Sequence, residues 1–256
     1  MKNTILLFAA ILLISIGVYA QKYSKVSKNP AWDYQYKNVG KISSIALALK
    51  NVSLTYERSI KPRLTGLLAV GYKFSGGWTP SLFKDQSASI LLGIKGIKGF
   101  SITPEVRYYL RSCENQTPNG FYTSIYLRYM NFNSGLDFTY YPNYPNKEEV
   151  YYFNADARFN EYGVGFLIGY QLLIKKRFVI DFMMIGPRYS WIKMKYDFDE
   201  NISKKFLTDL EGYLQSIVDR FEIDHKVEID KSGIKDASVS FNFTNVRFGI
   251  SLGYSF

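Results

Sequence analysis

The C-terminal segment Val246–Phe256 alternates without interruption between large apolar side chains and small or polar ones. Side chains of an extended strand point to opposite faces in turn, so one face of this segment would be entirely apolar. Its length matches the roughly 9 to 11 tilted residues with which a β-strand crosses a bilayer, and it ends on an aromatic residue. The segment therefore predicts a transmembrane strand with these residues on its lipid side: Val246, Phe248, Ile250, Leu252, Tyr254 and Phe256.

The same alternation recurs along the chain and predicts further strands. They cover residues 45–49, 52–56, 64–74, 100–110, 121–129, 162–174 and 178–196. Lys50-Asn51 is interpreted as a tight turn between the first two, with one kinked strand as the alternative. Pro104 predicts a bulge or a missing ladder bond, and Gly186-Pro187 predicts a bend. Near Thr244-Asn245 the apolar residues change parity, which predicts a bulge.

The connections between these strands alternate in length. Residues 60–63, 111–120 and 174–177 are short turns, whereas 76–100, 133–158 and 198–237 are long loops. In the last loop, apolar residues recur every three or four positions between Ile202 and Phe221, which predicts an amphipathic helix. We expect an all-β fold, an eight-stranded antiparallel transmembrane up-and-down barrel with short periplasmic turns and long extracellular loops, one of which carries this helix.

The hydropathy of the chain limits the ways in which it could span a membrane. Beyond the N-terminal segment the chain has no apolar run long enough for a transmembrane helix, which excludes an ordinary helical membrane protein. Only helices and closed barrels satisfy their backbone groups in lipid, so a chain that spans a membrane without helices must do so as a barrel. The aromatic content of 17% suits interfacial girdles. A soluble lipocalin-like barrel is an alternative, but its exterior would then be unusually rich in glycine.

The N-terminus has the features of an export signal. Lys2 precedes a mostly apolar run from Ile5 to Ile16, and Val18-Tyr19-Ala20 places small residues at the positions that a signal peptidase recognises. We expect a signal peptide over 1–20, cleaved after Ala20, a periplasmic lead-in over 21–40 and an outer-membrane barrel over 41–256. An uncleaved anchor is the alternative. The single cysteine, Cys113, allows no internal disulfide.

The net charge of +10 favours anionic partners. In an exported protein, these partners are outer-membrane lipid and the phosphates of lipopolysaccharide. Nucleic acid is not expected as a partner, because the Lys and Arg residues are scattered along the chain.

Six charged residues fall on the predicted inner face of the strands. An eight-stranded barrel is just wide enough to be filled by its own side chains, and charges removed from water are costly unless they are paired. We therefore expect a balanced lumen charge network that closes the interior, made of Glu57, Glu105, Arg107, Arg128, Asp181 and Arg247. A narrow polar pore is the alternative.

Catalytic and metal-binding patterns are weak. A lipid A-modifying enzyme would need a nucleophile with a base and an orienting group, but the only histidine, His225, lies in a charged loop without a predicted serine partner. Glu148-Glu149 and the acidic residues within 224–230 match no defined metal spacing. The prediction is a non-enzymatic outer-membrane protein without a cofactor, with a structural, surface-interaction or export- and assembly-accessory role. A lipid A-modifying enzyme is the alternative. The apolar face of the predicted helix could cover the barrel mouth, lie in the outer leaflet, dock a partner or pack on its own loops.

Several of these segments resemble a known class of proteins. The signal peptide, the strand end Tyr56-Glu57-Arg58, the strand Pro104–Leu110 and the terminal segment Arg247–Phe256 are similar to those of small, largely uncharacterised Gram-negative outer-membrane β-barrel proteins, which share the architecture of the OmpA and OmpX transmembrane domains. The resemblance covers about Gly40 to Phe256. It implies an outer-membrane location and a C-terminal signal read by the barrel-insertion machinery, carried by Phe248, Ile250, Leu252, Tyr254 and Phe256. We expect a monomer. An envelope protein is a further candidate partner.

Overall fold

The computed structural model describes residues 36–43, 50–74, 89–110, 117–220, 228–230 and 236–256. It is all-β, with antiparallel strands β1 (Asn38–Ser43), β2 (Asn51–Lys61), β3 (Leu64–Lys73), β4 (Ile90–Tyr109), β5 (Gly120–Tyr140), β6 (Tyr151–Ile174), β7 (Phe178–Phe198), β8 (Glu228–Asp230) and β9 (Asp236–Ser255). Helix α3 (Lys204–Arg220) lies between β7 and β8. Within the described ranges, no helix is both long and apolar enough to cross a membrane.

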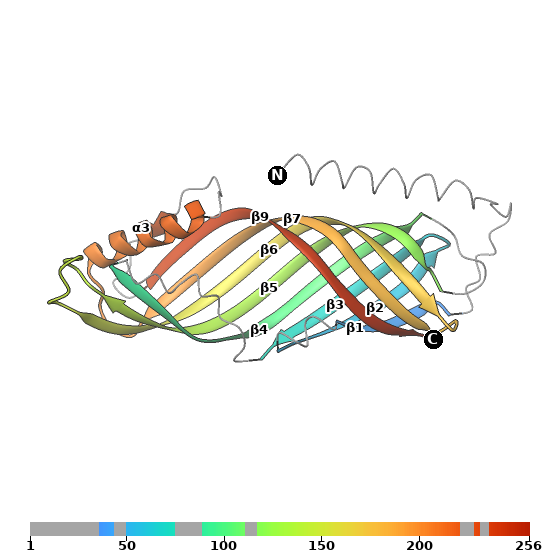
Figure 1. Ribbon diagram of the computed structural model, residues 1–256, viewed down its shortest axis with the longest axis horizontal. Coiled ribbons are helices and arrows are strands. Elements are labelled where there is room, and N and C mark those ends of the chain that lie inside the picture. The colour runs from blue at the N-terminus through green and yellow to red at the C-terminus, as the bar shows by residue number, and fades with distance from the viewer. Residues whose placement is uncertain (1–35, 44–49, 75–88, 111–116, 221–227, 231–235) are drawn as a thin grey trace. The chain divides into compact units, whose positions relative to one another are not determined.

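The strands form a ring-like sheet (Figure 1). Each strand from β1 to β7 pairs with the next, β7 pairs with β9, and β9 returns to pair with β1. Eight of the nine strands thus close the ring, while β8 pairs with β9 outside it. Near the short turns, closure gives each of these eight strands a neighbour on both sides, which removes the unpaired edges that an open sheet would expose there.

The closing pair lies earlier in the chain than the sequence predicts. Strand β9 pairs with β1 from Val39↔Ser255 to Ser43↔Ser251. We expected the first strand at 45–49, which falls outside the described residues, and we assigned Asn38 to Gly40 to the periplasmic lead-in. These three residues instead belong to β1, because they pair on both sides, with β2 and with β9.

The strands differ greatly in length. β1, β2 and β3 have 6, 11 and 10 residues, whereas β4 to β7 and β9 have 20 to 24. The long strands extend beyond the short ones at the end of the sheet where α3 lies, opposite the C-terminus (Figure 1). The predicted loop over 133–158 is therefore wrong. Strands β5 and β6 pair without interruption up to Tyr140↔Tyr151, and their connection is confined to residues 141–150. Strand β4 likewise begins at Ile90, inside the loop predicted over 76–100.

The long strands reverse their apolar face along their length. In β5, Ile125 points outward and is 64% exposed, whereas Leu136 and Phe138, further along the strand, point inward and are buried. Strand β9 behaves in the same way, with Val239 buried inside and Phe248 70% exposed outside. Near the short turns the outer face is apolar, and in the extended part of the strands, here called the extension, the inner face is apolar.

This reversal explains a wrong prediction. The change of parity near Thr244-Asn245 suggested a bulge in the last strand, but β7 and β9 stay in one register from Gly186↔Arg247 to Asp197↔Asp236. The backbone alternation continues, and only the environment of the two faces changes. The irregularity lies instead in β7, between Met183 and Gly186, at the bend predicted for Gly186-Pro187. At Pro104 the register with β5 does not shift, so no bulge forms there. The ladder between β4 and β5 instead lacks pairs at Thr103 and Pro104, which is the predicted alternative.

Candidate functional site

The interior of the ring near its short turns is filled by a buried ion-pair network centred on Asp181. This carboxylate, on β7, is 1% exposed. One of its oxygens, Oδ2, accepts from Lys41 Nζ at 2.8 Å and from Arg107 Nη1 at 2.7 Å, and Oδ1 accepts from the hydroxyl of Tyr122 at 2.7 Å. A single carboxylate therefore joins β1, β4, β5 and β7 across the interior.

Two further carboxylates extend the network. Glu57 Oε2 lies 2.5 Å from Lys41 Nζ, and Glu57 Oε1 accepts from Thr65 and Tyr109. Glu105 accepts hydrogen bonds from Arg107 Nε at 2.5 Å, from the Ser124 hydroxyl at 2.9 Å and from Arg247 Nη1 at 2.9 Å. Buried charges are stable only when they are paired and hydrogen-bonded, and these donors supply that pairing. The network thus joins strands from every part of the ring and occupies the space between them.

The structure brings together five of the six residues predicted for the lumen charge network: Glu57, Glu105, Arg107, Asp181 and Arg247. The sixth, Arg128, forms no ion pair with another described residue, and its buried Nε has no hydrogen-bond partner there. Glu161, a neighbouring acid on its side of the interior, is paired with Arg188 at 2.8 Å.

Sequence reasoning missed Lys41, Glu161 and Arg188. Lys41 escaped notice because it precedes the first predicted strand, yet it contacts both Glu57 and Asp181. Glu161 shares the parity of the inward Gly163, so extending the alternation by one position would have placed it inside. Arg188 lies within the predicted strand 178–196, but only the irregularity between Met183 and Gly186 brings its parity inside.

Two tyrosines fill the space beside the network by packing over glycines. Tyr122 lies over Gly169 and Tyr126 over Gly165, where an added Cβ would come within 2.5 Å of the Tyr126 ring. The same tyrosine rings lie under guanidinium groups, with Arg107 4.1 Å from the Tyr122 centroid and Arg247 4.9 Å from that of Tyr126. Glycine is required at both positions on β6 because the tyrosine rings occupy the space that a larger side chain would need.

Substitution Gly169→Ala should lower the free energy of unfolding by about 1–3 kcal/mol, because the new methyl group would clash with Tyr122 and lie 2.7 Å from the carbonyl oxygen of Phe182. Urea-induced unfolding of the purified protein measures this loss. The matched control is Gly212→Ala in α3, where an added Cβ meets nothing within 4 Å. Helix propensity should make that variant more stable by about 0.5–1 kcal/mol. Equal effects at the two positions would contradict the packing explanation.

The outer face of the ring carries a belt of exposed apolar side chains. It surrounds the ring on β2 to β7 and β9, and its members include Leu54, Leu68, Val70, Ile102, Val106, Ile125, Leu127, Val164, Phe166, Phe182, Phe248, Ile250 and Leu252. Exposed apolar patches on soluble monomers seldom exceed a few hundred Å². A continuous belt of this kind therefore requires an explanation beyond ordinary surface composition.

Two rows of aromatic side chains border the belt. On the side of the extension, cross-strand neighbours connect Tyr72 to Phe100 and Tyr129 to Tyr162 and on to Trp191, with Phe100 packed edge-on against Tyr129 at 5.8 Å. On the side of the short turns, the row consists of Tyr108, Phe121, Tyr170, Phe178 and Tyr254. The aromatic residues thus mark both borders of the apolar surface.

Helix α3 fills the inner face of the extension. Phe206 packs edge-on against Phe138, Phe153 and Phe198, and the buried core next to it includes Leu207, Leu210, Tyr213 and Leu214 of the same helix. The hydroxyl of Tyr140 donates to Asp209 at 2.5 Å, and burial together with this hydrogen bond raises the pKa of Tyr140. Of the roles considered for the apolar face of the helix, packing within the chain is the one observed.

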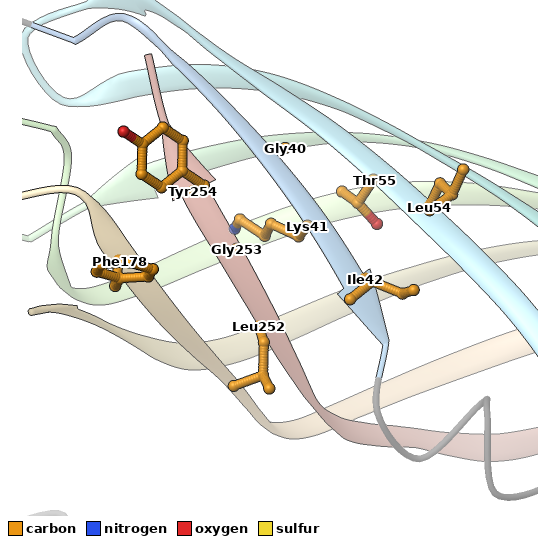
Figure 2. Close-up of a pocket in the computed structure, with 9 residues that line it drawn as sticks. All are labelled: Gly40, Lys41, Ile42, Leu54, Thr55, Phe178, Leu252, Gly253 and Tyr254. Atoms are coloured by element: carbon orange, nitrogen blue, oxygen red, sulfur yellow. The ribbon is translucent and has the colours of Figure 1, made fainter.

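A groove crosses the outer face over the seam between β1 and β9. Its volume is about 520 Å³. Figure 2 shows Gly40 and Ile42 on β1 between Leu54 of β2 and Leu252 of β9, with Tyr254 and Phe178 at the end near the short turns. The groove exists because Gly40 has no side chain between Tyr56 and Tyr254, its neighbours on the two adjoining strands.

The residues considered for metal binding or catalysis form no site among the described residues. The described residues hold no group of His, Cys, Asp and Glu side chains that could bind a metal ion. His225 and Cys113 lie outside the described residues, and Glu148 and Glu149 are exposed in the connection between β5 and β6.

The fold and the site together define an all-β protein with a closed antiparallel sheet, a charged and filled interior and an apolar outer face. The chain belongs to the family described as protein of unknown function (DUF3575), whose model matches residues 6–210, from the N-terminal segment into α3. The comparison with curated proteins returned no significant match.

Proposed function

We propose that the chain is an integral outer-membrane β-barrel protein that acts without catalysis, as a structural or surface-interaction component of the envelope. The observation that carries this proposal is the apolar belt with its two aromatic borders, since outer-membrane barrels have such a band flanked by aromatic girdles. A closed ring also supports the proposal, because paired neighbours on both sides satisfy the backbone hydrogen bonds of a strand, as lipid requires.

The spacing of the aromatic rows supports this interpretation. Tyr162 and Tyr170 lie on the same strand in opposite rows, which corresponds to about 26 Å along the strand at ~3.3 Å per residue. A tilt of about 35–45° reduces this distance to roughly 20 Å across the membrane, and the rings add to it. The apolar band of outer-membrane barrels is about 25 Å tall.

The outer surface of the extension indicates how the barrel is oriented in the outer membrane. Beyond the Tyr162 row the outer face becomes polar, with Asn154, Asp156, Lys193 and Lys195 exposed. Exposed charged side chains are costly in lipid, so we place this surface in water. The apolar interior around α3 agrees with this, because a part of a protein that lies in water has its apolar side chains inside. The short turns would face the periplasm and the extension the cell exterior. Its surface is then the part available to ligands or partner proteins.

The filled interior argues against the alternative of a narrow pore. The ion pairs of Asp181, Glu57 and Glu105 bridge strands across the ring, and an ion could pass only by separating buried, hydrogen-bonded charges. The alternative of a lipid A enzyme is favoured by no described group of nucleophile and base.

Expression of the full chain in a Gram-negative host tests the proposal. The protein should be recovered in the outer-membrane fraction and should migrate faster in an unheated gel sample than in a heated one, because a folded barrel resists detergent denaturation. Planar bilayers with the purified protein should stay electrically silent, and the lipid A mass spectrum should be unchanged. Recovery as a soluble protein without a mobility shift would overturn the barrel, and steady single-channel currents would overturn the closed interior.

A further inference from the structure

The groove over the β1–β9 seam has the dimensions and lining of a site for a long apolar chain. Its volume of about 520 Å³ lies within the roughly 300–1,000 Å³ typical of ligand sites. The side chains around it are almost all apolar, as Figure 2 shows for Ile42, Leu54 and Leu252. An added Cβ at Gly40 would meet only Phe256, at 3.8 Å, so the floor of the groove is open.

Two arginines belong to the segments that adjoin the end of the groove near the short turns. Arg58 is exposed on β2, where it pairs with Asn38, next to Gly40 on β1. On the other side, Arg177 donates to the hydroxyls of Tyr254 at 2.5 Å and Tyr36 at 3.0 Å. Both partners of Arg177 are neutral, and a guanidinium has five N–H donors, so its charge and several donors are available to a ligand.

The surrounding rim is strongly basic. Its described cations include Lys61, Arg63, Lys175 and Lys176, whereas the described side-chain carboxylates of this end, Glu57, Glu105 and Asp181, are buried in the interior network. The main chain of Phe256 at the C-terminus is held by Asn38. A single α-carboxylate at that position would offset only a small part of the positive charge.

The turn between β6 and β7 retains two of these cations at a conformational cost. Lys175 and Lys176 have φ values of 48° and 66°, in the left-handed region that favours Gly and Asn. An Asn-Gly pair would form the same turn with less strain. Both lysines are exposed beside Arg177 and add positive charge at this end of the ring.

We propose that the groove binds one anionic phospholipid, with its phosphate between Arg58 and Arg177 and an acyl chain along Gly40 and Ile42. Planar guanidinium groups bind phosphate through charge-assisted hydrogen bonds, and the lysines of the β6–β7 turn add attraction at longer range. The inference rests on the proposed function, because only a membrane-embedded ring presents this groove to a leaflet. The site would hold a lipid at the seam where the first strand meets the last.

Native mass spectrometry of the full chain released from nanodiscs tests the site. The nanodiscs contain equal amounts of phosphatidylglycerol and phosphatidylcholine with identical acyl chains. The wild-type protein should retain one phosphatidylglycerol at least tenfold more often than one phosphatidylcholine. The double variant R58Q/R177Q should reduce this preference at least fivefold, and Gly40→Leu, which fills the groove, should reduce the retention of both lipids.

Matched controls separate the site from general charge and bulk. The double variant K61Q/R63Q removes two cations from the same rim at the β2–β3 turn. Val164→Leu enlarges an apolar side chain on the outer face of β6, away from the seam. Both should behave as wild type. Insertion and heat-modifiable migration report the proposed function independently of lipid choice. A chain that inserts but retains both lipids equally, or that keeps its preference in R58Q/R177Q, overturns this inference alone, whereas a chain that does not insert overturns both.

Discussion

Asp181→Ala should lower the free energy of unfolding by about 3–5 kcal/mol, the cost of breaking a buried ion pair by removing one partner. The carboxylate accepts hydrogen bonds from Lys41, Arg107 and Tyr122 at 2.7–2.8 Å, and its loss leaves two cations buried with less compensation. Urea titration of the protein folded in lipid vesicles, followed by heat-modifiable migration, measures the loss.

A double-mutant cycle shows whether the loss arises from the network. Arg107→Ala alone should also be strongly destabilising, and the combined variant should lose less than the sum of the two, because each change removes the charge that the other leaves unpaired. Glu148→Ala, at an exposed position, should remain within about 0.5 kcal/mol of wild type. Additive effects of Asp181→Ala and Arg107→Ala would show that the two side chains act independently and would contradict the network.

Ile125→Arg distinguishes a membrane-embedded ring from a soluble one by the size of its effect. Ile125 is 64% exposed midway between the aromatic rows of β5. In a bilayer, arginine at the midplane of an outer-membrane barrel costs about 2–4 kcal/mol. On the exposed surface of a soluble protein the same change would stay within about 0.5 kcal/mol. Reversible urea unfolding from lipid vesicles should show the larger loss.

Ser240→Arg provides the matched control for this substitution. Ser240 is exposed on the outer face of β9 in the extension, opposite Lys193. Because we place this surface in water, the free energy of unfolding should change by no more than about 0.5 kcal/mol. If both arginines are tolerated equally, the apolar belt does not face lipid and the proposed orientation is wrong.

Much of the fold follows from the alternation of apolar and polar side chains. The sequence predictions assumed that the apolar side chains stay on the outer face along the whole of each strand. That assumption held for Val246–Phe256 and failed for residues 133–158, where Leu136 and Phe138 turn their apolar side chains inward. The segment was mistaken for a loop because its outward face is polar. The same assumption produced the bulge predicted at Thr244-Asn245, where the strand is regular.

The interior ion-pair network was also predicted only in part from the alternation of side chains. Parity alone indicated that Glu57, Glu105, Arg107, Asp181 and Arg247 share one face of their strands. It could not assign their partners, because these depend on strand register and on the closing pair of β1 with β9. That closure brings Lys41 to both Glu57 and Asp181, whereas Arg128, on the same face, meets no carboxylate of the network.

The sequence by itself determined the antiparallel strands, their short turns, the amphipathic helix and the outward apolar face of the C-terminal strand, because alternation and helical period are local properties of the chain. The tertiary structure decided where the apolar face reverses, which charges pair, and that α3 packs inside the extension. These features depend on which side chains lie opposite one another across the ring, and a groove over Gly40 arises only once the first and last strands have met.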